Sequence, residues 1–241
     1  MHDEDNTYGA PRITAELNDG APDGERVNHK RVARVMRSAG IAGYRRRRRV
    51  KTTTPDPAKQ KVPDLLNRDF TADEPGLKLV GDITYIPTWQ GWVYLATVLD
   101  CCTKKVVGYA MAEHMRTELV VDALKMAIIN GHTRHGETIF HSDRGTQYMS
   151  AEFAEFTRDA GIVRSVGRTG ICYDNAWAES FNATLKVERV HRTVYPTRRH
   201  AIGDIARYIE LRYNQRRLHS ALQYRTPNEA EQDWYETNKA A

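Results

Sequence analysis

Three acidic residues are the candidates for chemistry in this sequence. Asp82 lies in a run of β-branched and aromatic residues, Asp143 follows a short apolar run and precedes a glycine, and 35 residues separate Asp143 from Glu179. A lone aspartate among apolar strand residues is costly to bury unless it is paired or bound to a metal. Three carboxylates that met at one sheet edge would raise one another's pKa and become protonated unless cations neutralised them.

An oxygen-only, acid-rich site suits Mg²⁺, or Mn²⁺ in its place. Two such ions about 4 Å apart can activate a water or a 3′-hydroxyl and stabilise the leaving oxygen of an in-line phosphoryl displacement. We therefore predict that Asp82, Asp143 and Glu179 are the catalytic residues and the ligands of two metal ions. His141 shares a strand face with Asp143, and it either supports this site or is an ordinary buried histidine.

The segment that begins at Asp174 is predicted to be a helix, with that aspartate as its cap. At about 100° per residue, one polar stripe and one apolar stripe emerge. The polar stripe holds Asn175, Glu179, Asn182 and Lys186, and the opposite side holds Trp177, Phe181 and Leu185. Lys186 is predicted to bind a phosphate of the substrate, with a plain solvated lysine as the alternative. Asn175 and Asn182 are expected to orient either the substrate or the catalytic carboxylate.

The elements that must position these residues are three successive strands, followed by helices that alternate with strands. Residues 78–87, 92–100 and 105–112 are rich in strand-forming residues and are joined by turns, which predicts an antiparallel meander. The next segments predict a helix over 118–130, a strand over 139–141, a helix from Ser150 to Ala160 and a strand over 162–166. This order predicts an α/β fold, a mixed sheet with helices on its faces.

Residues 1–42 form the N-terminal region, and the whole charge excess of the chain lies in residues 1–70, which hold 15 Lys/Arg against 10 Asp/Glu. Residues 26–51 contain eleven basic residues and no acidic one, which suits a polyanion. A short helix over 12–19 and a second helix, capped by Asn28 and ending at Gly40, resemble a helix-turn-helix-like DNA-binding module; a solvated surface helix is the alternative. The apolar side of the second helix is predicted to hold Val32, Val35, Met36 and Ala39. The basic residues that we expect to contact DNA are Lys30, Arg31, Arg34 and Arg37.

Residues 43–70 are predicted to be a basic linker, because consecutive like charges and prolines oppose regular structure. Its five arginines are Arg45, Arg46, Arg47, Arg48 and Arg49. They are expected to contact phosphates without reading the base sequence; a flexible tether is the alternative.

The core is expected over 71–228. It should include a helix over 204–213 and, after it, a basic segment in which Arg217 contacts DNA. A frayed tail is expected over 229–241.

Four separated motifs carry a resemblance to a known family. They are Gly81-Asp82-Ile83-Thr84-Tyr85-Ile86, His141-Ser142-Asp143-Arg144-Gly145-Thr146-Gln147-Tyr148, Asp174-Asn175 with Glu179-Ser180-Phe181-Asn182 and Leu185-Lys186, and Tyr213-Asn214 with Arg217, His219-Ser220 and Thr226-Pro227. In this order and spacing they resemble the second-reading-frame transposases of bacterial insertion sequences of the IS3 type. The segments around Tyr8-Gly9 and Val27-Asn28 are similar to the small helical module that precedes the core in these proteins.

The resemblance implies a ribonuclease-H-like, retroviral-integrase-like core with an Asp, Asp, 35-residue gap, Glu signature. It implies a DNA transposase that cleaves and joins insertion-sequence ends to target DNA, acting as at least a dimer on duplex DNA. It also implies an upstream reading-frame product, fused to this chain or acting with it. The alternatives are a non-catalytic DNA-binding remnant or regulator of transposition, and a related ribonuclease-H-like nuclease.

Composition limits the class of protein. The 241 residues suit one sizeable domain and a small one. No apolar run approaches the ~18 residues of a membrane span, and the acidic start does not resemble a signal peptide, so a cytoplasmic, nucleoid-associated protein is expected. Cys101, Cys102 and Cys172 form no CxxC pattern, so neither disulfides nor zinc are expected and the three are interpreted as small core residues.

Overall fold

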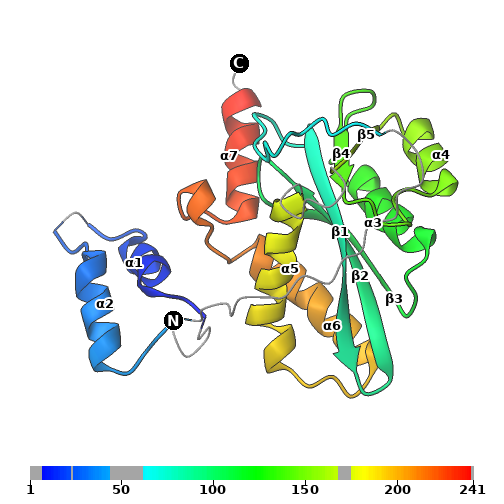
Figure 1. Ribbon diagram of the computed structural model, residues 1–241. Coiled ribbons are helices and arrows are strands. Elements are labelled where there is room, and N and C mark those ends of the chain that lie inside the picture. Colours follow the sequence, from blue (N-terminus) through cyan, green and yellow to red (C-terminus); the bar gives the residue numbers. More distant parts are fainter. Residues whose placement is uncertain (1–6, 23, 44–61, 168–174, 240–241) are drawn as a thin grey trace. The chain divides into compact units, whose positions relative to one another are not determined.

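The chain forms two compact units in a computed structural model that describes residues 7–22, 24–43, 62–167 and 175–239 (Figure 1). The smaller unit combines residues of the first 51 with Leu218–Arg225, and the larger unit holds the remainder. The predicted arginine contacts at 45–49, the predicted cap Asp174 and the predicted core residue Cys172 lie outside the described residues.

The larger unit is built on one five-stranded sheet. Its strands are β1 (Lys78–Thr88), β2 (Gly91–Asp100), β3 (Val106–Ala112), β4 (Ile139–Ser142) and β5 (Val163–Val166), in the order β3-β2-β1-β4-β5. The first three strands are antiparallel, whereas β4 runs parallel to both β1 and β5. The predicted meander and mixed sheet are confirmed.

Helices cover both faces of this sheet (Figure 1). One face packs against α3 (Thr117–Ile129) and α4 (Ala151–Asp159), and the other against α5 (Ala176–Glu188), α6 (Arg198–Arg207) and the π-helix η3 (Tyr208–Asn214). As predicted, Ser150 caps α4, since its side chain accepts a hydrogen bond from the Phe153 N–H. Within the described ranges, no helix is long and apolar enough to cross a membrane.

The helix predicted over 204–213 begins earlier, and it changes from an α-helix to a π-helix. Thr197 caps α6 by accepting a hydrogen bond from the His200 N–H, so the helix starts at Arg198, after the short 3-10 turn η2 (Val190–Arg192). Thr197, a residue type that often caps helices, was the sequence signal that would have indicated this earlier start. From Tyr208 onward the chain continues as a π-helix that ends at Asn214.

The C-terminal tail is not frayed, contrary to the prediction. Residues of the predicted tail form α7 (Pro227–Lys239). The Trp234 Nε1–H donates to the Asp73 carbonyl over 3.0 Å, and Lys105 lies 2.5 Å from Glu231. The larger unit also begins before residue 71, because Leu66 is buried in its core. These side-chain anchors to distant residues hold segments that local composition alone predicts to be loose.

The smaller unit contains α1 (Ala10–Asn18), α2 (His29–Ser38) and the short η4 (Ser220–Leu222). Its buried core residues are Tyr8, Ile13, Val32 and Met36. The Asn28 side chain caps α2, as predicted, by accepting a hydrogen bond from the Lys30 N–H. Val35 was expected on the buried side but is 56% exposed. Leu218 joins this unit rather than the larger one, since its N–H donates to the Tyr8 hydroxyl over 3.2 Å.

Candidate active site

Asp82 lies where β1 extends beyond its parallel neighbour. Pairing with β4 ends at Val80, so the described sheet leaves the next part of that edge without a strand beside it. The Asn182 amide of α5 donates to the Asp82 Oδ2 over 2.8 Å, and the Ile83 N–H donates to Oδ1 over 2.9 Å. The strand and the helix therefore hold this carboxylate from two sides.

The pKa of Asp82 is raised to about 7. Removal from water is the largest cause, the charge of Asp143 is the second, and the charge of Glu179 adds to both. The hydrogen bonds from Ile83 and Asn182 oppose the rise without cancelling it. The fold thus brings the three carboxylates that the sequence singled out close enough for their charges to interact.

Asp143 and Glu179 reach this place from different elements. Asp143 directly follows β4, and its Oδ1 accepts a hydrogen bond from the Gly145 N–H over 2.9 Å. Its pKa is also raised, because neighbouring protein displaces water from the carboxylate although part of the residue is exposed. Glu179 is exposed on the first turn of α5. Two exposed carboxylates from different elements therefore lie close enough to Asp82 for their charges to raise its pKa.

The chemical type of the three side chains suits a hard cation. The three side chains offer only carboxylate oxygens, which Mg²⁺ prefers, and a cation would relieve the repulsion that raises the pKa of Asp82. In the part of the chain that the structure describes, no three His, Cys, Asp or Glu side chains already form a cluster that could hold one ion.

Two asparagines of the polar stripe on α5 point at β1. The Asn175 amide donates to the Gly81 carbonyl over 3.0 Å, one residue before the contact between Asn182 and Asp82. Both asparagines are buried, and both Oδ1 atoms lack a hydrogen-bond partner among the described residues. In this conformation they contact the strand, and the DNA contacts predicted for them stay a prediction.

Lys186 lies on α5 two turns beyond Glu179, as predicted. Its ammonium nitrogen is 4.5 Å from the centre of the Tyr85 ring, so it is neither a plain solvated lysine nor buried. Tyr85 is itself 47% exposed on β1. The lysine therefore lies against an aromatic side chain that the sequence did not single out.

Arg217 has a different environment from the one expected. It is 5% exposed, and its guanidinium forms an ion pair with Glu188 at the end of α5, with Nη2 to Oε1 at 2.9 Å. In this conformation the guanidinium binds a carboxylate inside the protein, which leaves it no access to a phosphate. By contrast, the basic residues predicted to bind DNA on α2 are all exposed, namely Lys30, Arg31, Arg34 and Arg37.

Two further residues near the carboxylates have buried aromatic rings. The pKa of the Tyr148 hydroxyl is raised by burial and by the charges of Asp82 and Asp143, so the hydroxyl lies close enough for both charges to act on it. His141 is fully buried, and its Nδ1 is 2.7 Å from the Ser165 Oγ. The charge of His141 lowers the pKa of Asp143, and the supporting role predicted for His141 stays a prediction. The position of Tyr148 five residues after Asp143 was the available signal for its placement.

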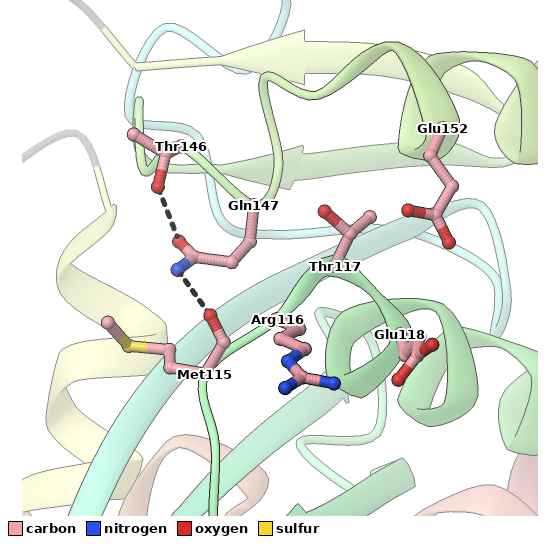
Figure 2. Close-up of a pocket in the computed structure, with 7 residues that line it drawn as sticks. All are labelled: Met115, Arg116, Thr117, Glu118, Thr146, Gln147 and Glu152. Carbon is pink, nitrogen blue, oxygen red and sulfur yellow. Dashed lines mark hydrogen bonds between the residues drawn. The ribbon is translucent and has the colours of Figure 1, made fainter.

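A shallow hollow of about 370 Å³ flanks the loop that follows Asp143 (Figure 2). Gln147, which comes from this loop, donates to the Met115 carbonyl over 2.8 Å and so ties the loop to the start of α3. The remaining lining residues are Arg116, Thr117, Glu118, Thr146 and Glu152. None of the three candidate carboxylates lines it, so the hollow is separate from the candidate site.

Protein-family models match both the N-terminal helical region and the region that holds the three carboxylates. An HTH-like domain matches residues 1–49, and two integrase core domains match residues 72–172 and 160–227. The transposase for insertion sequence element IS904 of Lactococcus lactis subsp. lactis (strain IL1403) is 37% identical over 96% of this chain and 90% of the relative. Transposase InsF for insertion sequence IS3A of Escherichia coli (strain K12) is 38% identical over 88% of this chain and 73% of the relative.

Solved structures share the fold at low sequence identity. A chain of the simian T-cell lymphotropic virus intasome in complex with PP2A regulatory subunit B56 gamma has a TM-score of 0.53 and 16% identity, over 73% of this chain and 60% of that one. The HTLV-2 integrase catalytic core domain in complex with magnesium, in its trimeric form, has a TM-score of 0.50 and 17% identity, over 65% and 97%. The predicted integrase-like fold is confirmed.

Proposed function

This chain belongs to the insertion-sequence transposases of the IS3 type, and on that premise we propose that Asp82, Asp143 and Glu179 catalyse metal-dependent strand cleavage and strand transfer at the ends of an element. The observation that carries the proposal is the raised pKa of Asp82, caused partly by the charges of the other two. Carboxylates that repel one another at a sheet edge are typical of a cation-binding site, because a bound cation removes the repulsion.

The three carboxylates would hold Mg²⁺, and two such ions, when bound, supply activation of the attacking oxygen and stabilisation of the leaving oxygen. The HTLV-2 integrase core with a similar fold was solved with magnesium. Asn182 would keep the Asp82 carboxylate in one orientation. The exposed Glu179 would complete the ligand set.

Duplex DNA would be the partner, and at least two copies of the chain would pair two element ends. The exposed basic side chains of α2, with the arginines at 45–49, are proposed to contact phosphates. Lys186 would hold a phosphate close to the carboxylates. The two buried asparagines are better placed to orient β1 and its carboxylate than to touch DNA.

Strand transfer in vitro tests the catalytic assignment. Purified protein, Mg²⁺ and a labelled duplex that carries the element's end should yield products joined to target DNA. Glu179→Gln and Asp143→Asn should each reduce joining by at least about a thousandfold, while binding of the same duplex changes less than about twofold, because the loss concerns the reacting centre alone. EDTA should stop the reaction and added Mg²⁺ should restore it. Joining that survives either variant would remove that residue from the site.

Salt dependence of binding tests the helical module. Replacing Arg34 and Arg37 by alanine should weaken binding of duplex DNA and reduce the slope of log K against log salt by roughly 2, since each lost phosphate contact contributes about 0.9. Alanine replacement of Arg158, which is exposed in the larger unit, is the control for the loss of a surface arginine. An unchanged slope in the double variant would make α2 a plain surface helix.

A further inference from the structure

The hairpin of β1 and β2 exposes aromatic side chains that the catalytic proposal does not use. Tyr85 is 47% exposed and Trp92 is 46% exposed. Their rings pack edge to face, with centroids 4.9 Å apart and planes at 80°. Aromatic rings left at the surface as a contiguous pair indicate a contact surface, because each offers a large apolar face to a partner.

The backbone that carries this pair is held in place. At the turn, the Trp89 N–H donates to the Tyr195 carbonyl over 3.0 Å. The Arg198 N–H donates to the Gln90 side chain over 3.0 Å, and the Thr88 hydroxyl donates to the Gly91 carbonyl over 2.7 Å. A surface presented on such a braced hairpin loses little freedom when a partner binds, which favours binding.

A cation lies directly against the aromatic pair. The Lys186 ammonium is 4.5 Å from the centre of the Tyr85 ring. This contact places a cation that can bind a phosphate beside the aromatic pair. Aromatic faces beside a cation are the combination by which proteins bind unpaired nucleotides.

The aromatic pair is also close to the carboxylates. Tyr85 contacts Lys186, and Lys186 follows Glu179 by seven residues on one stripe of α5, which corresponds to about 10 Å at the rise of an α-helix. Stacked nucleotides of one DNA strand are about 3.4 Å apart. A strand whose phosphate reacts at the carboxylates would therefore place a base within about three steps of Tyr85 and Trp92.

We propose that Tyr85 and Trp92 form a stacking platform for an unpaired base of the DNA strand next to the reacting phosphate, with Lys186 on the phosphate that follows. The inference rests on the proposed catalytic role of Asp82. It adds to that role a preference for DNA that is frayed or single-stranded at this point, because a base in an intact duplex has no free face to offer the platform.

Binding of two matched DNA probes tests the platform. One is a labelled duplex with three unpaired 3′ nucleotides, the other is the same duplex with a blunt end, and both are measured by fluorescence anisotropy in EDTA. Wild-type protein should bind the tailed probe about tenfold more tightly, within the range expected for base stacking on an aromatic ring. Tyr85→Thr and Trp92→Thr should each lose most of this preference. Threonine is chosen because it retains strand propensity.

Three controls make the result specific. Tyr85→Phe should keep the preference, since the ring remains. Tyr235→Ala removes an exposed tyrosine on α7 and should change nothing. With 2-aminopurine in the tail, wild-type protein should quench the fluorescence by stacking, and Tyr85→Thr should not.

Tail preference that survives in both threonine variants would overturn the platform. So would a change in sedimentation from dimer to monomer in Trp92→Thr without a change in tail preference, because the pair would then be a protein interface. The binding assay needs no metal and no catalysis. A wild-type protein that showed the tail preference but no strand transfer would therefore count against the proposed function and in favour of the platform.

Discussion

Helix α5 contributes to two polar sites, one along its N-terminal half and one at its C-terminal end, and the two sites differ in how their charges are paired. At the C-terminal end, the Glu188 carboxylate accepts hydrogen bonds from Arg217 and from the Tyr208 hydroxyl, the latter over 2.7 Å. At the N-terminal site, Asp82 of β1 accepts a hydrogen bond from Asn182 but lies near two further carboxylates. One site pairs opposite charges, whereas the other gathers like charges.

This difference separates a polar site that stabilises the fold from one that is available for binding. A buried carboxylate with a cation and a hydroxyl has little to gain from a ligand. A carboxylate whose pKa is raised by its neighbours gains from any cation that binds. Among the described residues, the amide oxygens of Asn175 and Asn182 also lack a hydrogen-bond donor. The contrast explains why Arg217, although it lies in a basic segment, serves the fold.

The largest expected effect is on the paired site. Arg217→Met should lower the free energy of unfolding by about 3 to 5 kcal/mol, because it leaves the Glu188 carboxylate buried without its cation. Urea unfolding followed by circular dichroism measures this change. The double variant Arg217→Met with Glu188→Leu should recover most of the loss. A double variant as unstable as the single one would show that the ion pair is not the reason.

A smaller effect of opposite sign is expected at the unpaired site. The pKa of Asp82 is about 7 in the folded chain and near its ordinary value of 3.8 in the unfolded chain. The free energy of unfolding should therefore fall as the pH rises between these two values, because the folded chain resists ionisation of this carboxyl. Asp82→Asn should therefore raise Tm by several degrees, roughly 3 to 8 °C, at pH 8 and by little at pH 4.

Mg²⁺ should remove this gain, since a bound cation would stabilise the wild-type carboxylate and not the amide. Thermal unfolding of both proteins at the two pH values, with EDTA or with Mg²⁺, provides the comparison. A gain in Tm that were the same at pH 4 and pH 8 would contradict the raised pKa. Asp122→Asn, at an exposed residue of α3, is the matched control.

The smallest expected effect concerns the amide that holds Asp82. Asn182→Ala removes the hydrogen bond that lowers the pKa of Asp82, so the acid limb of the pH profile for strand transfer should move to higher pH. The loss of stability should be only about 1 kcal/mol. Thr184→Ala, on the same helix, should leave the profile unchanged. An unshifted profile in Asn182→Ala would mean that the amide does not act through Asp82.

The strands and the three carboxylates were predictable because their signals are local. Alternation of apolar residues determines which face of β1 is buried, and an aspartate among them is conspicuous by its cost. The cap at Ser150 and the cap at Asn28 were predicted in the same way, since a capping side chain bonds within three residues of itself. The separation of Asp143 and Glu179 carried the family resemblance without any knowledge of their geometry.

Signals that depend on distant partners were misjudged. The charge of Arg217 suggested a phosphate, because a basic residue gives no local indication of a carboxylate 29 positions away. The end of the chain looked loose, because its anchor is the Asp73 carbonyl, 161 positions from Trp234. Tyr85 looked like an ordinary strand residue, since its exposure depends on which strand pairs with β1 beyond Val80.

What the sequence by itself determined was therefore the set of elements, the residue types of the site and the family. The tertiary structure decided which polar side chains face one another across α5 and β1, and so which charges are paired and which repel. The physical reason is range. Propensity and capping act within a few residues, whereas burial, desolvation and Coulomb interactions depend on neighbours in space, which residue spacing alone does not specify.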